Sequence, residues 1–353
     1  MREFGSEFEI GYLPDNYFSD IANRMPYSSL TRSGREAIGL AIDGMEPGVA
    51  LLPAYCCWSM ALPFEAAGWS VAYYPIKQDL SVDIPGMMSL VEKLKPGVVL
   101  VMDYYGYAPT REAVASVKEC DGEIFVMEDF TQCLFTLPEK WNAQVDCYVA
   151  SIRKSLGVPD GGMVLSKREL DLSILSKERT TFLEEHIKAG IKKKRYAYSA
   201  DTGEKQVFRE CQAMAGSAIK KDYHLYDISS ESRAIIKNTD VETVKYARKI
   251  NYEHLYNLIK DNPNFSIMFK PGDNQAPFML IIKSDKRDTL QRLLANKGVF
   301  CQVIWPVSDK AKEICLVSKE MEEKMLAIPI DQRYNYDDIE EIARRINSVL
   351  CLD

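Results

Sequence analysis

Lys154 is the residue whose position most clearly suggests chemistry. It follows an apolar run at 147–152 that predicts a strand, and Gly161-Gly162 leads back into another apolar run. Ligands of α/β sheets bind just beyond the carboxyl ends of the strands. An amine that is desolvated there, or set near another cation, becomes a nucleophile. A surface ion pair is the alternative role for this lysine.

Asp129 stands at the end of a second predicted strand. The apolar run that leads to it is followed by Glu128-Asp129-Phe130-Thr131-Gln132. A carboxylate at a strand end can anchor a cation or a protonated ring nitrogen. A solvated loop acid is the alternative, and it is the commoner role for any single aspartate.

A third segment, Thr31-Arg32-Ser33-Gly34-Arg35, opens a predicted helix. Free backbone N–H groups and the positive end of the helix dipole suit a phosphate at such a position. A simple serine cap explains the same residues. Neither a GxxxxGK[ST] loop nor a GxGxxG fingerprint occurs, so nucleotide hydrolysis and Rossmann-type hydride transfer lose their main sequence support.

The elements that would position these residues follow an α/β alternation. Six short apolar runs predict strands, several of them apolar at every position, as a sheet buried on both faces requires. They lie at 49–53, 71–75, 98–103, 124–127, 147–152 and 163–165, with helical patterns between them at 34–45, 58–67 and 110–120. The alternation predicts a mostly parallel sheet with crossover helices.

The remainder of the chain differs in character. Residues 167–237 are rich in Lys and Glu and predict long helices, either a partly exposed layer or an arm of an oligomer. From about residue 240 a smaller α+β part is expected, with strands at 265–269, 278–282 and 299–305 and helices at 287–297 and near the C-terminus. We therefore predict a large α/β domain over 1–238 and a small domain over 239–353.

Composition excludes several classes of function. The 353 residues carry a formal net charge of −7, with no basic patch that would indicate nucleic acid. The nine cysteines form no CxxC pair and the three histidines lie far apart, so neither a metal site nor a disulfide framework is expected. The charged N-terminus and the absence of a long apolar run predict a cytoplasmic protein without a membrane span.

Taken in order, these segments resemble the DegT/DnrJ/EryC1/StrS aminotransferases, a branch of the fold-type I enzymes that depend on pyridoxal 5'-phosphate (PLP). The likeness runs over most of the chain. Five motifs carry it: the glycine-helix entry with Leu52-Pro53-Ala54-Tyr55, the turn Asp79-Leu80-Ser81-Val82-Asp83, the acidic motif at 128–132, Lys154 seven residues before Gly161, and Leu326-Ala327-Ile328-Pro329-Ile330.

The resemblance implies a role for each residue. Lys154 would hold PLP as a Schiff base and move a proton, and Asp129 would pair with the pyridinium nitrogen. Gln132 would lie near the phenolic oxygen of the cofactor. Ser33, Gly34, Arg35 and Ser151 would hold the phosphate, and a homodimer would complete the site.

Some positions depart from the family pattern. The family reads S-F-H-x-T-K before its lysine, whereas Ser151 stands only three residues before Lys154. The aromatic residue that covers the cofactor ring is replaced by Cys57, with Tyr55 and Trp58 nearby as substitutes. The family's Gly-Tyr-Asn segment is not evident near 195–198. A divergent branch is therefore expected.

Three hypotheses follow. The first is an aminotransferase that moves an amino group from glutamate or glutamine to a nucleotide-linked keto sugar in polysaccharide or secondary-metabolite biosynthesis. The second is another PLP-dependent reaction, such as a lyase or an amino-acid-transforming enzyme. The third is a non-catalytic homologue, against which the retention of both Asp129 and Lys154 argues.

Overall fold

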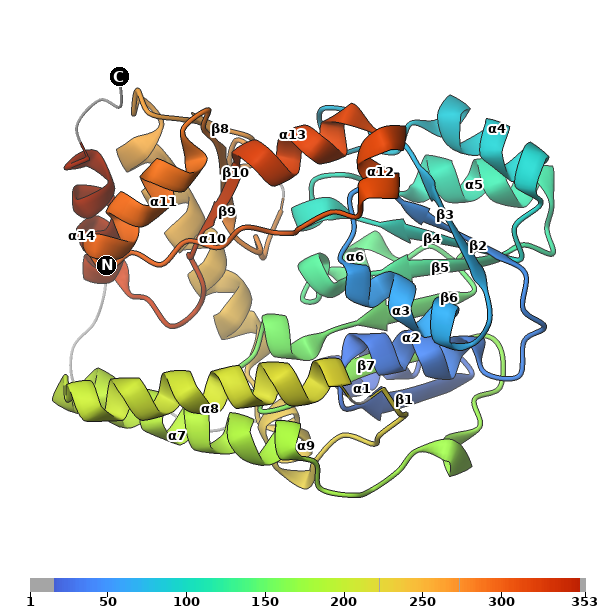
Figure 1. Cartoon of the computed structure of the whole chain (residues 1–353), viewed down its shortest axis with the longest axis horizontal. Helices are drawn as coiled ribbons and strands as arrows, with labels where there is room; N and C mark the ends of the chain where they lie inside the picture. Colours follow the sequence, from blue (N-terminus) through green and yellow to red (C-terminus); the bar gives the residue numbers. More distant parts are fainter. Residues whose placement is uncertain (1–15, 222, 273, 350–353) are drawn as a thin grey trace, which may run out of the picture.

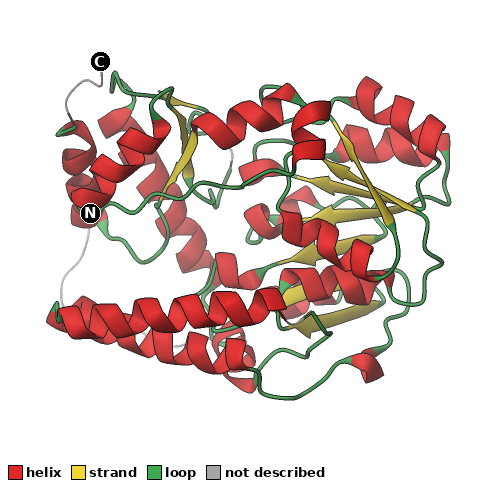
Figure 2. Ribbon diagram, in the orientation of Figure 1, coloured by secondary structure: helices red, strands yellow, loops and turns green. Residues whose placement is uncertain are grey.

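The computed structural model describes residues 16–221, 223–272 and 274–349. Its large part is a seven-stranded sheet with the order β1-β7-β6-β5-β4-β2-β3 (Figures 1 and 2). The strands are β1 (Tyr27–Thr31), β2 (Val49–Pro53), β3 (Ser70–Tyr74), β4 (Val98–Met102), β5 (Phe125–Asp129), β6 (Cys147–Ala150) and β7 (Gly162–Ser166). The predicted α/β class is confirmed.

The centre of the sheet is buried on both faces. Each of the five residues of β4 is buried, and β5 and β6 are buried over almost their whole length. Apolar side chains at consecutive positions are therefore needed, because successive residues point to opposite faces. Strands β2 to β6 run parallel, so their carboxyl ends meet at one edge of the sheet.

Helices pack against this sheet, and in Figure 1 α2 and α3 lie in front of it. The helices of the large part are α1 (Tyr17–Ala22), α2 (Gly34–Ile42), α3 (Trp58–Ala66), α4 (Ile84–Leu94), α5 (Arg111–Cys120) and α6 (Leu137–Lys140). Helix α4 begins directly after Asp83, whose side chain accepts a hydrogen bond from the Gly86 N–H.

The Lys/Glu-rich segment forms a helical hairpin, α7 (Thr181–Ser199) and α8 (Thr202–Lys221), followed by α9 (Ser230–Lys237). Thr180 caps α7, and Ala200 in a left-handed conformation ends it. The hairpin runs along the lower edge of the molecule and extends beneath the C-terminal helices (Figure 1). The predicted helical layer is thus present, and its role in an oligomer remains a prediction.

The C-terminal part is an α+β unit with its own core. The antiparallel sheet β10-β9-β8 comprises β8 (Ser266–Ile267), β9 (Leu280–Lys283) and β10 (Met325–Ile328). The helices are α10 (Val241–Ile259), α11 (Arg287–Asn296), α12 (Asp309–Ile314), α13 (Leu316–Lys324) and α14 (Tyr336–Asn347). The main core also includes Phe278 and Ile304, so the two parts share apolar contacts; the domain boundary at 238 stays a prediction.

Three features differ from the prediction. The run 299–305 is not a strand: it makes one bridge, Gln302 to Ala327, and then leads to α12. Phe300 is exposed, whereas Val299 and Cys301 are buried in the core of the C-terminal part, and Ile304 and Trp305 are buried in the main core. Strand β1 was not predicted, since Tyr-Ser-Ser-Leu-Thr is too polar to stand out. Strand β7 runs antiparallel to its neighbours β6 and β1.

Among the helices in the described ranges, none combines the length and the apolar character that crossing a membrane requires.

Candidate active site

Asp129 ends β5 at the edge of the sheet where the parallel strands terminate. Its side chain is buried, and Oδ1 accepts a hydrogen bond of 2.8 Å from the Thr131 N–H. The Thr131 hydroxyl in turn accepts a bond of 2.9 Å from the Ser151 N–H, just beyond β6. These two bonds join the ends of the neighbouring strands and bring Asp129 and Ser151 into one small region.

The charge of Asp129 lacks full compensation. Burial raises the pKa of this carboxyl group, whereas the charge of Lys154 and the hydrogen bonds to Thr131 act in the opposite direction. Among the described residues no Lys, Arg or His forms an ion pair with Asp129. A buried carboxylate of this kind favours a cationic ligand beside it. Asp129 therefore fits a protonated ring nitrogen.

Lys154 lies at the end of a 3-10 turn (Ile152–Lys154) that directly follows β6. The turn is closed by bonds from the Ser155 and Leu156 N–H groups to the Ile152 carbonyl. The Lys154 side chain is exposed, and its Nζ lies 5.4 Å from the centre of the Trp305 ring. The amine is therefore accessible to a ligand and has an aromatic neighbour from the C-terminal part.

The start of α2 lies against the start of this turn. A Cβ atom added to Gly34 would come within 3.1 Å of both Cβ and the backbone nitrogen of Ser151. This close approach favours glycine, because any other residue would require the Ser151 backbone to shift by a few tenths of an ångström. The Ser33 side chain makes no capping bond, so first-turn N–H groups stay directed out of the helix end. The arrangement is a cradle suited to a phosphate.

The Arg35 side chain points away from that cradle. Its guanidinium donates a hydrogen bond to the Ile219 carbonyl of α8 and lies 5.9 Å from the Tyr223 ring. Arg35 can thus contribute only its backbone to the cradle. The assignment of Arg35 to the phosphate stays a prediction, and it would involve the backbone of this residue.

The three candidates for the ring-covering position differ in their surroundings. Tyr55 is fully buried, stacked on Tyr104 at 5.6 Å and 5.3 Å from Trp305. Cys57 precedes α3 and accepts a hydrogen bond from the Ser59 hydroxyl. Trp58 is 44% exposed. Tyr55 is thus part of the core, which leaves Cys57 and Trp58 as the accessible candidates.

Gln132 supports the backbone near the ends of β4 and β5. Its side chain is buried, and Oε1 accepts a hydrogen bond of 2.8 Å from the Tyr105 N–H. Tyr105 has φ of 57°, a left-handed conformation that a bulky residue adopts only under constraint. Gln132 therefore has a structural task in addition to the predicted one at the cofactor oxygen.

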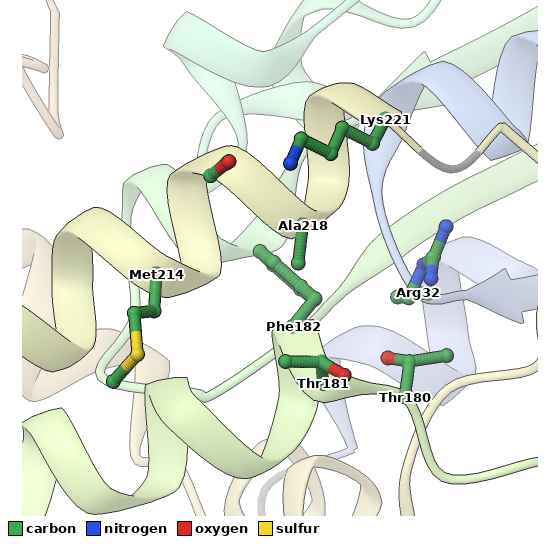
Figure 3. A pocket seen from close by; sticks show the side chains of 8 residues that line it. Arg32, Thr180, Thr181, Phe182, Met214, Ala218 and Lys221 are labelled. Carbon is green, nitrogen blue, oxygen red and sulfur yellow. The ribbon is translucent and has the colours of Figure 1, made fainter.

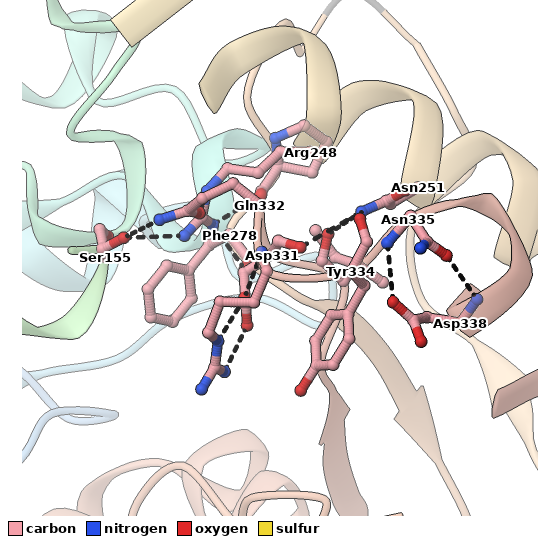
Figure 4. A network of polar contacts seen from close by, with 12 residues as sticks. Ser155, Arg248, Asn251, Phe278, Asp331, Gln332, Tyr334, Asn335 and Asp338 are labelled. Atoms are coloured by element: carbon pink, nitrogen blue, oxygen red, sulfur yellow. Dashed lines mark hydrogen bonds and ion pairs between the residues drawn. The ribbon is translucent and has the colours of Figure 1, made fainter. Parts of the chain in front are cut away.

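A polar network from the C-terminal part holds the loop that carries Lys154 (Figure 4). Arg248 of α10 donates a hydrogen bond of 3.2 Å from Nη2 to the carbonyl of Ser155, the residue after Lys154. Gln332 Nε2 donates a hydrogen bond of 2.9 Å to the same carbonyl, and the Gln332 side-chain oxygen accepts one of 2.9 Å from Arg248 Nε. Arg248 Nη1 also donates to the carbonyls of Pro277 and Phe278. The C-terminal part thus fixes the loop beside the reactive amine.

Arg248 is held by neutral acceptors. Burial lowers the pKa of its guanidinium to about 10; the charge of Arg333 acts in the same direction, and that of Asp331 opposes it. Asp331 itself is engaged by Arg333 through two contacts of 2.6 and 2.7 Å. We refer to Arg248, Gln332 and the Ser155 carbonyl as the domain clamp.

Figure 3 shows a cavity of about 440 Å³ between the start of α7 and the end of α8. Arg32 reaches it from the end of β1, and Phe182 and Lys221 line it. The Arg32 guanidinium is 2.6 Å from the Glu36 carboxylate and 3.9 Å from the centre of the Tyr226 ring. Its charge is therefore already compensated within the protein, and we assign no function to this cavity.

The sequence did not point to several residues of the site. The Lys154 loop is contacted by Arg248, Trp305 and Gln332, which lie 94 to 178 residues further along the chain (248 − 154 and 332 − 154). No local pattern marks them. Thr131 lies inside the acidic motif, so its proximity to Asp129 was visible, whereas its bond to Ser151 was not.

The chain, with its seven-stranded sheet and C-terminal α+β part, has the fold of several solved aminotransferase structures. Comparison with solved structures finds this fold in a DegT DnrJ EryC1 StrS aminotransferase from Brucella abortus, at a TM-score of 0.61 and 15% identity, covering 95% of this chain and 91% of that chain.

Two further solved structures are similar. Sugar aminotransferase CalS13 from Micromonospora echinospora has a TM-score of 0.63 and 14% identity, with 96% of this chain and 93% of that chain covered. DesV from S. venezuelae, solved with a ketimine intermediate, has a TM-score of 0.63 and 13% identity, with 95% and 89% covered. Comparisons with protein-family models and with curated proteins found no match.

Proposed function

We propose that this protein is a PLP-dependent aminotransferase that acts on a keto sugar, with glutamate or glutamine as the amino donor. The observation that carries the proposal is the buried, incompletely compensated Asp129 at the same sheet edge as the exposed amine of Lys154. The shared fold with CalS13, described as a sugar aminotransferase, supports the choice of substrate. DesV, which was solved with a ketimine intermediate, supports the choice of cofactor.

When bound, PLP supplies an electron sink for the carbon that loses its proton. Asp129 would hold the proton on the pyridine nitrogen, because the paired charges offset the cost of burying its carboxylate. The Lys154 amine would carry the cofactor covalently and move a proton at the reacting carbon. The cradle at Gly34 and Ser151 would bind the phosphate.

The keto sugar is proposed to be nucleotide-linked, with the product used in polysaccharide or secondary-metabolite biosynthesis. We further propose a cytoplasmic homodimer. Exposed apolar side chains on the hairpin, among them Ile191, Tyr198 and Met214, offer surface for a second copy. Light scattering coupled to size-exclusion chromatography measures the mass in solution, and a monomer at micromolar concentration would contradict the dimer.

Cofactor attachment is the first test. Purified protein mixed with PLP should turn yellow, and borohydride should fix the cofactor to the peptide that contains Lys154, as read by mass spectrometry. Lys154→Ala should lose the colour and the labelled peptide, whereas Lys77→Ala, at an exposed lysine outside the site, should keep both. A protein that stays colourless and unlabelled would remove the proposal.

The reaction is the second test. Addition of glutamate or glutamine should bleach the visible band, and a nucleotide-linked keto sugar should restore it with formation of the amino sugar. Bleaching without transfer to any keto sugar, accompanied by loss of carbon dioxide or of a side-chain fragment, would instead indicate a lyase.

A further inference from the structure

A cavity of about 580 Å³ lies between the loop that carries Lys154 and the helical layer. Its walls come from residues 153 and 157–159 of the loop, from α7 and α9, and from Gln212 of α8. In Figure 1, α9 lies beside the first turns of α7. We call this space the loop cavity. Neither Lys154 nor any other residue assigned above to the cofactor lines it.

Arg153, the residue before Lys154, brings an uncompensated guanidinium to the loop cavity. The side chain is partly buried, and its buried Nε has no hydrogen-bond partner within the described part of the chain. Its Cζ lies 5.7 Å from the centre of the Phe182 ring. A guanidinium offers five N–H donors, and a buried donor without an acceptor costs free energy. A ligand that supplies the acceptor would recover this cost.

The carboxylates closest to Arg153 are already engaged by other groups. Burial lowers the pKa of the Arg153 guanidinium and the charge of Arg35 acts in the same direction, whereas Glu36 and Asp160 oppose the shift. Glu36 forms an ion pair of 2.6 Å with Arg32. Asp160 accepts hydrogen bonds from two serine hydroxyls. An anion in the loop cavity would therefore offset both the desolvation and the repulsion from Arg35.

The other charges of the lining add to the positive potential. Lys193 and Lys194 of α7 contribute two ammonium groups, and neither forms an ion pair with a carboxylate in the ranges that the structure describes. Glu231 of α9 lines the cavity as well, but Arg179 holds its carboxylate at 2.8 Å. The charge available to a ligand in this cavity is therefore positive.

The walls of the loop cavity are tied to one another before any ligand binds. His186 of α7 donates from Nδ1 to the Pro159 carbonyl at 2.7 Å. Asp160, the next residue of the loop, accepts 3.0 Å from the N–H of Ser229, which caps α9. Both helices are thus anchored to the Lys154 loop. A preformed site of this kind binds its ligand with little ordering cost.

The remaining lining is largely apolar. It consists of residues from the loop, α7 and α9: Val158, Ile187, Ala189, Ile191 and Ile235. The volume falls in the range of roughly 300–1,000 Å³ that is usual for small-molecule sites. The cavity therefore has room for an organic group as well as an anionic head group, and its walls favour an apolar one.

We propose that the loop cavity binds an organic anion, a carboxylate or phosphate that carries a compact apolar group, as an effector outside the candidate active site. The Arg153 guanidinium would hold the oxyanion through a bidentate pair of hydrogen bonds, with Lys193 and Lys194 adding attraction. Arg153 and Lys154 belong to one 3-10 turn, so the ligand would hold the same loop that the domain clamp holds at the Ser155 carbonyl. The inference goes beyond the proposed function, because this binding requires no reaction at Lys154.

Isothermal titration calorimetry on the full chain, with and without saturating PLP, tests the inference. The probes are benzoate and phenyl phosphate, with inorganic phosphate as a head group alone and benzamide as an uncharged analogue. At least one of the two aromatic anions should bind, benzamide should not, and the tighter anion identifies the head group. Arg153→Gln should weaken binding about tenfold or more. Arg292→Gln, at an exposed arginine of α11 outside the lining, is the matched control and should bind like the wild type.

Two further variants separate binding from folding. Without a ligand, Arg153→Gln should unfold at the same temperature as the wild type or higher, because an uncompensated charge is removed. Benzoate or phenyl phosphate should raise the unfolding temperature of the wild type and leave that of the variant unchanged. The exposed pair Lys193→Gln/Lys194→Gln should weaken binding several-fold without a change in stability.

Four results would count against the inference. It is overturned if neither aromatic anion binds, or if Arg153→Gln leaves the affinity unchanged. Loss of binding in Lys154→Ala, or displacement of the anion by PLP, would place the ligand in the candidate active site and overturn it as well. Equal affinities for inorganic phosphate and phenyl phosphate would refute the role of the apolar walls.

Failure of the proposed function has a different signature. If the protein never takes up PLP but binds an aromatic anion in an Arg153-dependent manner, the proposed reaction is wrong and the loop cavity assignment stands. If PLP attaches to Lys154 and neither anion binds, the loop cavity assignment alone is wrong.

Discussion

Two regions of the molecule, the edge of the large sheet and the contact between the two parts of the chain, each bury a charged side chain. The two side chains differ in how far polar groups of the protein compensate their charge. Asp129, at the sheet edge, receives a hydrogen bond from Thr131 and lacks an ion-pair partner among the described residues. Arg248, in the domain clamp, donates to three carbonyls and to the Gln332 side chain. A buried charge whose hydrogen-bond partners all come from the protein has a structural role. A buried charge without such compensation is suited to binding a ligand of opposite charge.

The largest expected effect comes from Asp129→Asn. Loss of the carboxylate should lower kcat of the loaded enzyme about 1000-fold, because an amide cannot hold the proton on the ring nitrogen. The same change should leave the protein without cofactor as stable as the wild type at pH 8 or more stable, since a buried charge is removed. Steady-state kinetics and thermal unfolding of both forms measure this. If the cofactor-free Asp129→Asn variant is less stable than the wild type, the Asp129 charge is compensated within the protein, as that of Arg248 is.

Arg248→Met should have the opposite profile. It removes the Arg248 donors to the carbonyls of Pro277 and Phe278 and one of the two donors to the Ser155 carbonyl, and we expect a loss of about 3 kcal/mol in the free energy of unfolding. Urea denaturation of the cofactor-free protein provides the measurement. Arg248→Lys keeps the charge and one donor, so it should restore part of the loss; a neutral outcome for the Met variant would show that the domain clamp contributes no stability.

Glu128 is a second buried carboxylate, next to Asp129 in β5, and it points to the opposite face of the sheet. Its Oε1 accepts a hydrogen bond of 2.8 Å from the Thr110 hydroxyl, and Oε2 has no hydrogen-bond partner within the described part of the chain. Burial raises its pKa to about 7, and the charges of Asp103 and Asp129 act in the same direction. The unfolded chain therefore loses this proton first as the pH rises, so stability falls between about pH 4.5 and about pH 7.

Glu128→Gln keeps an acceptor for Thr110 and removes the charge. It should stabilise the protein by roughly 2 kcal/mol at pH 8 and make little difference at pH 4.5. Thermal unfolding across this pH range measures the difference between variant and wild type. If the stability difference between variant and wild type does not change with pH, Glu128 is not the titrating group.

The smallest effect is expected from Gln332→Ala. It removes one of two donors to the Ser155 carbonyl and the acceptor of Arg248 Nε, at a cost of about 1 kcal/mol. If the domain clamp positions the Lys154 loop, this variant should also lower kcat several-fold with KM nearly unchanged. A change confined to stability would restrict the network to a structural role.

Much of the sheet was predictable because strands buried on both faces need apolar residues at consecutive positions, which is easily seen in a sequence. Val49–Pro53 was predicted with its observed bounds, since apolar residues at consecutive positions allow few other structures. The run 299–305 is also largely apolar, yet most of its side chains are buried in the two cores without strand pairing. Burial is visible in a sequence, whereas the partner that provides it is not.

The candidate site shows the same limit. Asp129, Lys154 and Gly34 each follow a local pattern of strand end or helix start, and the fold brings their elements to one edge. Arg248 and Trp305 follow no such pattern, because their roles depend on contacts with residues 93 and 151 positions away (248 − 155 and 305 − 154).

The pairing of β1 with β7 has a consequence for synthesis of the chain. Thr31 pairs with Gly162, so β1 waits for 131 further residues (162 − 31) before its partner exists. At about 10 residues per second, translation covers that interval in roughly 13 seconds. Strands β2 to β6 are complete earlier and pair with one another. The contact of Gly34 with Ser151 therefore forms late during emergence from the ribosome, and the phosphate cradle is among the last parts of the large sheet to assemble.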